Sequence, residues 1–185
     1  MPQTMDDLLQ EHRTIAKLLD LLERQLGLLE KSETPNYELM LQILDYFRSF
    51  PDLYHHPKED LVFRRLAERD PEQAARFGDL EAEHQHCSDR LNAFSRAIVV
   101  ALFEAETPRT FIGPARNFID NERCHMASEE KTLFPAAIRC LTDDDWAEID
   151  VCSARYKDPL SEEYAGDRLD LLRSELLKAP DAMAV

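Results

Sequence analysis

Two histidine–glutamate pairs with the same spacing stand in distant parts of the chain. His55 precedes Glu59 by four positions, and His125 precedes Glu129 by four positions. Residues four apart share one face of an α-helix and lie about 6 Å apart along its axis, so each pair can present two donors to one metal centre. Imidazole and carboxylate donors together suit iron or manganese. The pairs therefore predict a metal site carried by two helices.

His12 and His84 extend the pattern to four histidines in separate stretches of the chain. The separation between His12 and His55 nearly equals that between His84 and His125, so the first 140 residues resemble two copies of one helical hairpin. Four helices would bring these donors together in a common core. There the two carboxylates can bridge two ions, while each imidazole binds one ion as a terminal ligand.

Helical phase distinguishes His55 from its neighbour His56. His55 shares a helix face with apolar residues such as Phe47 and Val62, whereas His56 shares one with acidic residues such as Asp52. We therefore expect His55 to point into the core and His56 to point outward, outside the ligand set. The predicted metal ligands are His12, His55, Glu59, His84, His125 and Glu129.

Each of these residues has an ordinary structural explanation when it is taken alone. A single histidine on an apolar helix face is more often a hydrogen-bonded core residue than a ligand, and a glutamate four positions later is often a simple helix pair. Burying several such groups without a common partner would be costly. The ordered, evenly spaced set therefore favours a metal site.

Residues beside the ligands are candidates for supporting roles. Cys87 lies on the same helix face as His84, where its thiol could bind or respond to a metal, although a cysteine on an apolar face usually only packs. Glu122 lies near His125 and can accept a hydrogen bond from a ligand. Tyr54 can donate to a bridging oxygen or simply bury its ring.

Long helices are needed to position the donors, and the apolar periodicity predicts them. The expected helices of the bundle cover residues of about 4–31, 37–69, 71–102 and 108–139. Thr4 and Thr107 are candidate N-caps. Pro51 and Pro57 lie inside the second helix, where each removes a hydrogen bond, so a bend is expected at residues 50–57.

Residues 141–185 are expected to form an appendage packed on the bundle. Thr142 and the three aspartates after it predict a capped helix reaching about Tyr156, and a last helix is expected over about 161–178. A homodimer interface is the alternative role for these helices. The predicted fold class is all-α, an up-and-down four-helix bundle at residues 1–140 with two shorter C-terminal helices.

The composition favours a helical protein and disfavours nucleic acid as a partner. Only four glycines occur among 185 residues, and 44% of the residues are apolar, which is enough for a core. A net charge of −15 repels phosphate backbones and anionic headgroups, so neither nucleic acid nor a membrane is expected to bind. Without a signal peptide, a membrane span or a CxxC pair, the sequence predicts reduced thiols and a cytoplasmic protein.

Four stretches of the sequence resemble the hemerythrin-like HHE cation-binding domains in their order and spacing. They are LLQEHRTI (8–15), YHHPKEDLVFRRL (54–66), EAEHQHC (81–87) and HMASEEKTLFPAA (125–137). The resemblance implies an up-and-down four-helix bundle holding two non-haem iron ions with an oxo or hydroxo bridge, a centre that binds oxygen, peroxide or nitric oxide. Manganese or zinc could replace the iron. The resemblance further implies four terminal histidine ligands, which are His12, His55, His84 and His125. It also implies two bridging carboxylates, Glu59 and Glu129.

The chain departs from the oxygen-carrying hemerythrins at Ser88, where those proteins have a further histidine four residues after the ligand of the third helix. Fewer protein donors leave an open coordination position, which favours reactivity or regulation over oxygen storage. We therefore expect a metal-binding protein that senses or handles oxygen, peroxide, nitric oxide or iron. A di-iron enzyme of nitric oxide reduction or iron–sulfur cluster repair is the alternative, and a helical interaction module with adventitious zinc is a third.

Overall fold

The structure is a computed structural model that describes residues 1–103, 108–156, 158, 160 and 170–178. In the first hairpin, α1 (Gln3–Glu30) is followed by α2 (Tyr37–Phe50), the π-helical turn η1 (Pro51–His55) and α3 (His56–Arg69). The second contains α4 (Pro71–Phe77), α5 (Leu80–Phe103), the 3₁₀ turn η2 (Pro108–Phe111), α6 (Ile112–Ser128), the π-helical turn η3 (Glu129–Leu133) and α7 (Phe134–Cys140). The shorter helices α8 (Asp143–Ser153) and α9 (Asp170–Lys178) follow.

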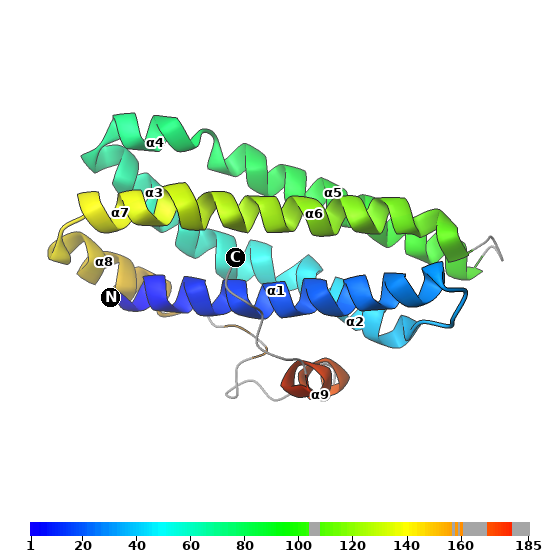
Figure 1. Cartoon of the computed structure of the whole chain (residues 1–185). Coiled ribbons are helices and arrows are strands. Elements are labelled where there is room, and N and C mark those ends of the chain that lie inside the picture. Colours follow the sequence, from blue (N-terminus) through cyan, green and yellow to red (C-terminus); the bar gives the residue numbers. More distant parts are fainter. Residues whose placement is uncertain (104–107, 157, 159, 161–169, 179–185) are drawn as a thin grey trace.

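The long helical segments run up and down the molecule side by side (Figure 1). Among the described residues there are helices and connecting segments but no strand. These features confirm the predicted all-α, hemerythrin-like bundle.

Capping side chains explain where several helices begin. Asn36 accepts a hydrogen bond of 3.0 Å from the backbone N–H of Leu39 at the start of α2, and Asp70 accepts one of 3.1 Å from that of Gln73 in α4. Thr142 caps α8, as the sequence predicts, and it forms a capping box with Asp145 three residues later.

Two predicted helix features are wrong. Thr4 lies inside α1 instead of capping it, and its N–H and hydroxyl donate to Asp150 of α8 at 2.8 and 2.6 Å. Gly78 adopts a φ of 105°, which interrupts the third predicted helix between α4 and α5. The predicted cap Thr107 and the predicted start of the last helix at Ser161 lie outside the described residues.

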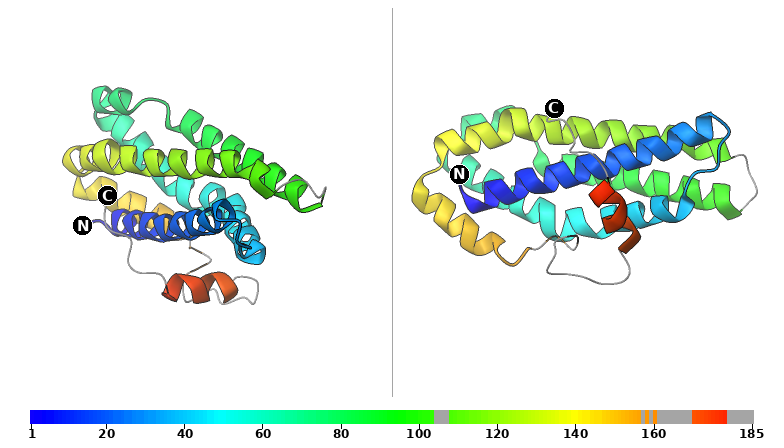
Figure 2. Two further views of the ribbon diagram at one scale, coloured as in Figure 1. Left: turned by 45° about the vertical axis from the view of Figure 1, so that its right-hand side comes forward. Right: turned by 60° about the horizontal axis from the view of Figure 1, so that its bottom comes forward.

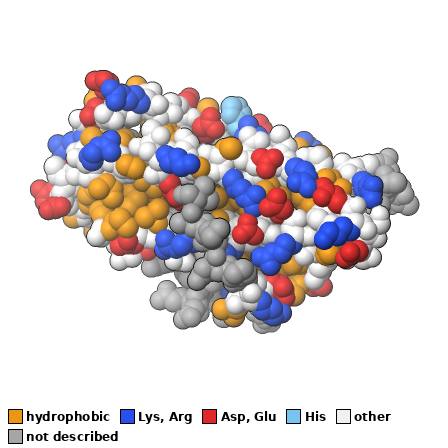
Figure 3. Space-filling model, viewed as in Figure 1, with side chains coloured by type: hydrophobic (Ala, Val, Ile, Leu, Met, Phe, Trp, Pro, Cys, Tyr) orange, Lys and Arg blue, Asp and Glu red, His pale blue; other side chains and the backbone are white. Residues whose placement is uncertain are grey.

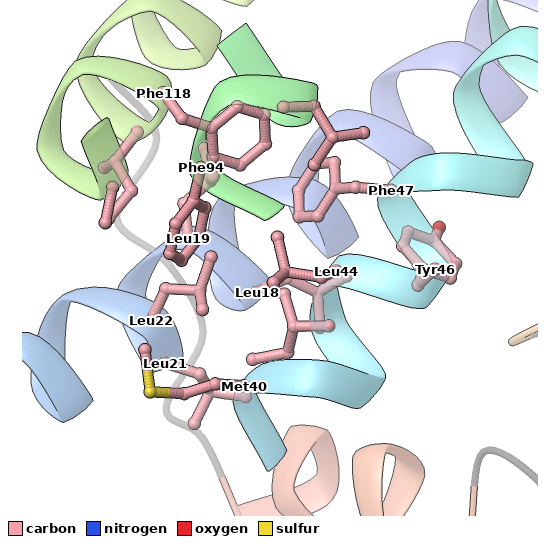
Figure 4. Packing of buried hydrophobic residues seen from close by; sticks show 14 of the residues in the cluster. Leu18, Leu19, Leu21, Leu22, Met40, Leu44, Tyr46, Phe47, Phe94 and Phe118 are labelled. Atoms are coloured by element: carbon pink, nitrogen blue, oxygen red, sulfur yellow. The ribbon is translucent and has the colours of Figure 1, made fainter. Parts of the chain in front are cut away.

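Two apolar clusters fill the bundle on either side of the predicted ligands. In Figure 4, leucines of α1 face Leu44 and Phe47 of α2, with Phe94 and Phe118 packed over them. The second cluster lies towards the other end and includes Leu8 and Val62. On α1, for example, His12 lies between Leu8 of the second cluster and Ile15 of the first.

The C-terminal helices contact the first hairpin. α8 packs against α1 and α3, and α9 lies against α1 and α2 (Figure 2). Leu172 of α9 is fully buried in the core. The predicted division of the chain into a bundle of residues 1–140 and an appendage of residues 141–185 packed on it stays a prediction.

The face shown in Figure 3 carries acidic and basic side chains interspersed over the long helices. Among the described residues, none of the helices combines the length and the apolar character that crossing a membrane requires.

Candidate metal centre

The helices bring all six predicted ligands into one buried cluster. Each is at most 8% exposed, and together they come from α1, η1, α3, α5, α6 and η3: His12, His55, Glu59, His84, His125 and Glu129. The cluster therefore combines donors from all four long segments of the bundle.

Glu59 lies between histidines on two sides. Its Oε1 is 3.1 Å from Nε2 of His55 and 3.4 Å from Nε2 of His12. Its Oε2 is 3.3 Å from Nε2 of His84. One carboxylate oxygen thus faces each group of imidazoles.

Glu129 repeats this arrangement from the second hairpin. Its Oε2 is 3.5 Å from Nε2 of His12, and its Oε1 is 3.3 Å from Nε2 of His125. Donor atoms that lie at right angles about 2.1 Å from one ion are about 3 Å apart, so separations of this size suit ligands of a common ion. Both carboxylates can therefore bridge two neighbouring metal positions.

Unpartnered polar atoms concentrate in this cluster. Among the described residues, five of the six buried side-chain nitrogen or oxygen atoms without a hydrogen-bond partner belong to it: Glu59 Oε2, His84 Nε2, His125 Nε2, Glu129 Oε1 and Glu129 Oε2. Buried polar atoms are normally hydrogen-bonded, and leaving them without a partner is costly. The cluster thus has the donor atoms and the free bonding capacity that a metal ion needs.

The expectation that His56 points outward is wrong. Its side chain is buried, and its ring stacks on that of His84 with the centroids 3.7 Å apart. Its Nδ1 donates to Asp52 at 3.2 Å, which leaves Nε2 free for a metal. The π-helical turn η1 explains the error, because a π turn rotates successive side chains less than an α-helix does and changes the phase after it.

The donors form two groups. Donor atoms of His56, Glu59, His84 and His125 all lie within 4.8 Å of one another, and so do those of His12, His55 and Glu59. We call these groups the His84 position and the His12 position. Glu59 belongs to both, and Glu129 has an oxygen towards each.

Carboxylates also lie behind the histidines of the His12 position. Nδ1 of His12 is 2.9 Å from Glu130 Oε1, and Nδ1 of His55 is 2.9 Å from Glu11 Oε2. Such contacts fix the orientation of a metal-binding imidazole. The sequence pattern did not predict this role for Glu130. On a regular α-helix, Glu130 would point away from the face of its neighbour Glu129. The π-helical turn η3 begins at Glu129 and changes the direction of the side chains.

The metal-free cluster holds protons that a cation would displace. Burial would lower the pKa of His55, but the carboxylates of Glu59 and Glu11 raise it to about 10. Burial and the charge of Glu59 raise the pKa of Glu129 to about 7. Burial lowers the pKa of His125 to about 3, so this imidazole is neutral and its nitrogen can offer a lone pair to a metal ion. Metal binding at such a cluster releases protons and depends on pH.

The predicted supporting residues lie beside the cluster. Cys87 and Glu122 are buried, and burial raises the pKa of both side chains, that of Glu122 to about 7. With His56 they border a cavity of about 10 Å³, which has room for about one water molecule. The half-buried Tyr54 stacks its ring on Phe50, with the centroids 6.2 Å apart.

The fold and the cluster define a helical-bundle protein with a buried histidine and carboxylate site for metal ions. Residues 3–137 match the family model of the hemerythrin HHE cation binding domain. The chain therefore belongs to the hemerythrin HHE family, and the resemblance noted in the sequence is confirmed. Comparisons of the chain with curated proteins and with solved structures find no match.

Proposed function

We propose that the protein holds two non-haem iron ions and uses them to bind oxygen, peroxide or nitric oxide. The residues of the His12 position would hold one ion and those of the His84 position the other, and Glu59 and Glu129 would offer oxygens to both. The observation that carries this proposal is that each carboxylate has one oxygen towards each position, while five donor atoms of the cluster lack a hydrogen-bond partner.

The donor set supports iron and a small ligand. A mixture of imidazoles and carboxylates suits iron or manganese, whereas thiolates would favour other metals, and burial raises the pKa of the Cys87 thiol, which keeps it protonated. When bound, iron supplies the open coordination position at which such a ligand attaches. The cavity of about 10 Å³ beside His56 is too small for an organic substrate, so only a ligand of few atoms could approach the centre from there.

Iron content tests the bridging role of the carboxylates. Wild-type protein loaded with ferrous iron under anaerobic conditions should contain about two iron ions per chain, and Glu59→Ala/Glu129→Ala should retain almost none. Mössbauer and optical spectra before and after exposure to oxygen and nitric oxide would report the number of coupled ions and their ligands. Unchanged iron content in the double variant would overturn the proposal.

Two histidine variants test the assignment of the His84 position. His56→Ala should lower the iron content from about two ions per chain to about one, because the His84 position loses a donor. His86→Ala is the matched control, since His86 is an exposed histidine of α5 outside both groups. Equal iron content in the two variants would remove His56 from the ligand set.

A further inference from the structure

The two sides of the candidate centre differ in how they meet the surface. At the His12 position, His12 and His55 are 2% and 3% exposed. Phe134 stacks on His12 with the ring centroids 5.3 Å apart, and the ring of Phe50 lies 6.0 Å from that of His55. Aromatic rings therefore cover this position.

The His84 position adjoins a depression in the surface. The depression measures about 250 Å³. We call it the acidic depression because three carboxylates line it together with two histidines of the centre. Its lining residues include Asp52, His56, Asp60, Glu81, His84 and Ser88. It lies between α3 and α5.

His84 connects this depression with the interior. Its Nδ1 is 3.8 Å from Asp60 Oδ1 at the surface, and its Nε2 is 3.3 Å from Glu59 Oε2 inside the cluster. Nε2 lacks a hydrogen-bond partner, and the side chain is 10% exposed. One imidazole thus forms part of the wall of the depression and part of the centre.

Charge favours cations on this side of the centre. The side chains of Asp52 and Asp60 are 55% and 44% exposed. Glu81 lies close enough to act on Asp60, on which His84 and Arg64 are the positive influences. On the opposite side, the partly exposed Glu130 is bonded to His12 and lies near Arg13 and Lys131, which oppose an approaching cation.

We propose that divalent cations enter and leave the centre through the acidic depression, passing Asp60 and Glu81 to reach the histidines of the His84 position. This inference rests on the proposed function, because it presupposes a metal centre. A depression lined by one sign of charge raises the local concentration of the opposite ion and speeds its association, an effect that salt weakens.

The rate of iron uptake tests the route. Metal-free protein is mixed anaerobically with ferrous iron at low ionic strength, and free iron is captured by a coloured chelator after set times. Asp60→Asn/Glu81→Gln should take up iron about tenfold more slowly than wild type and still reach the same final content. At 1 M salt, where screening acts over about 3 Å, the difference should nearly vanish.

Glu33→Gln/Glu38→Gln is the matched control, because it also removes two exposed carboxylates but changes the far end of the bundle. It should load iron at the wild-type rate. If both double variants take up iron at the same rate and both reach two ions per chain, the proposed route is overturned but the proposed function is not. Reduced final iron at an unchanged rate would also overturn it, since these carboxylates would then be ligands. A wild-type chain that takes up no iron would overturn the proposed function and the route with it.

Discussion

Lys58 is buried beside the candidate centre, where its ammonium contacts Glu11. The other oxygen of Glu11 accepts a hydrogen bond from Nδ1 of His55 at 2.9 Å. A carboxylate in this place orients the imidazole and makes it a stronger donor, and the ammonium moderates the added negative charge. Glu11 therefore acts as a positioning residue for His55, and Lys58 balances it.

Replacing Glu11 should destabilise the metal-free protein strongly. Glu11→Gln leaves the Lys58 ammonium buried without its carboxylate, and breaking such a pair typically costs about 3–5 kcal/mol. The free energy of unfolding in urea measures the loss. Adding Lys58→Met to Glu11→Gln should recover part of it, because an unpaired charge no longer needs to be buried. Costs that simply add in the double variant would contradict this account.

Each hairpin contains one π-helical turn beside its histidine–glutamate pair. η1 ends at His55 and η3 ends at Leu133, and in each case a proline follows two residues later, Pro57 and Pro135. Proline has no N–H to donate to the preceding turn, so the regular hydrogen-bond pattern is interrupted there. The turns do not follow the repeat of the histidines, because η1 ends at the histidine of its pair whereas η3 begins at the glutamate of its pair. Each turn nevertheless carries a predicted ligand.

The break between α4 and α5 depends on a single glycine. Gly78 has a φ of 105°, a conformation that other residues rarely adopt, although its surroundings leave room for a methyl group. Gly78→Ala should therefore destabilise the protein by about 1–2 kcal/mol through backbone strain. Chemical denaturation would measure the change.

Gly27→Ala provides the control for this prediction. Gly27 lies inside α1, also with room for a methyl group, so alanine should stabilise the protein there by about 0.5–1 kcal/mol. Opposite signs for the two substitutions are expected. A loss of stability in both would point to packing instead of backbone conformation.

The connection between α8 and the bundle depends on polar contacts, most of them partly buried, at both ends of the helix. Near its start, Asp145 accepts hydrogen bonds from Nε and Nη2 of Arg69 in α3 at 2.9 and 2.8 Å. Near its end, Asp150 and Ser153 bond to the hydroxyl of Thr4, both at 2.6 Å. These contacts hold α8 against α1 and α3 of the first hairpin.

Asp145→Asn should lower the free energy of unfolding by about 1–2 kcal/mol at neutral pH, since it weakens both the pair with Arg69 and the helix cap. Hydrogen bonds from Arg69 and Thr142 hold the pKa of Asp145 well below its usual range. A depressed pKa stabilises the fold above the unfolded-state value of about 3.9, and this contribution is lost as the pH falls below it.

The difference between wild type and Asp145→Asn should therefore shrink between about pH 4 and pH 2. Thermal unfolding followed by circular dichroism across this range would show it. Asp144→Asn is the control, because Asp144 is exposed in the same turn and should change stability by less than about 0.5 kcal/mol. A constant difference at every pH would contradict the role of the Asp145 carboxylate.

The sequence by itself determined the helical class, the family and the buried places of the six predicted ligand residues. These features follow from spacing along the chain, because residues three or four apart share a helix face wherever the helix lies. The prolines also indicated an irregular segment near His55, although not its form.

Only the tertiary structure decided which further groups surround the centre. His56 turns inward because a π-helical turn changes the phase of α3 and α5 supplies His84 to stack against it. The contacts of Glu130 with His12 and the acidic depression likewise join segments distant in sequence. Local periodicity is set by neighbouring residues, whereas these contacts depend on how whole helices pack against one another.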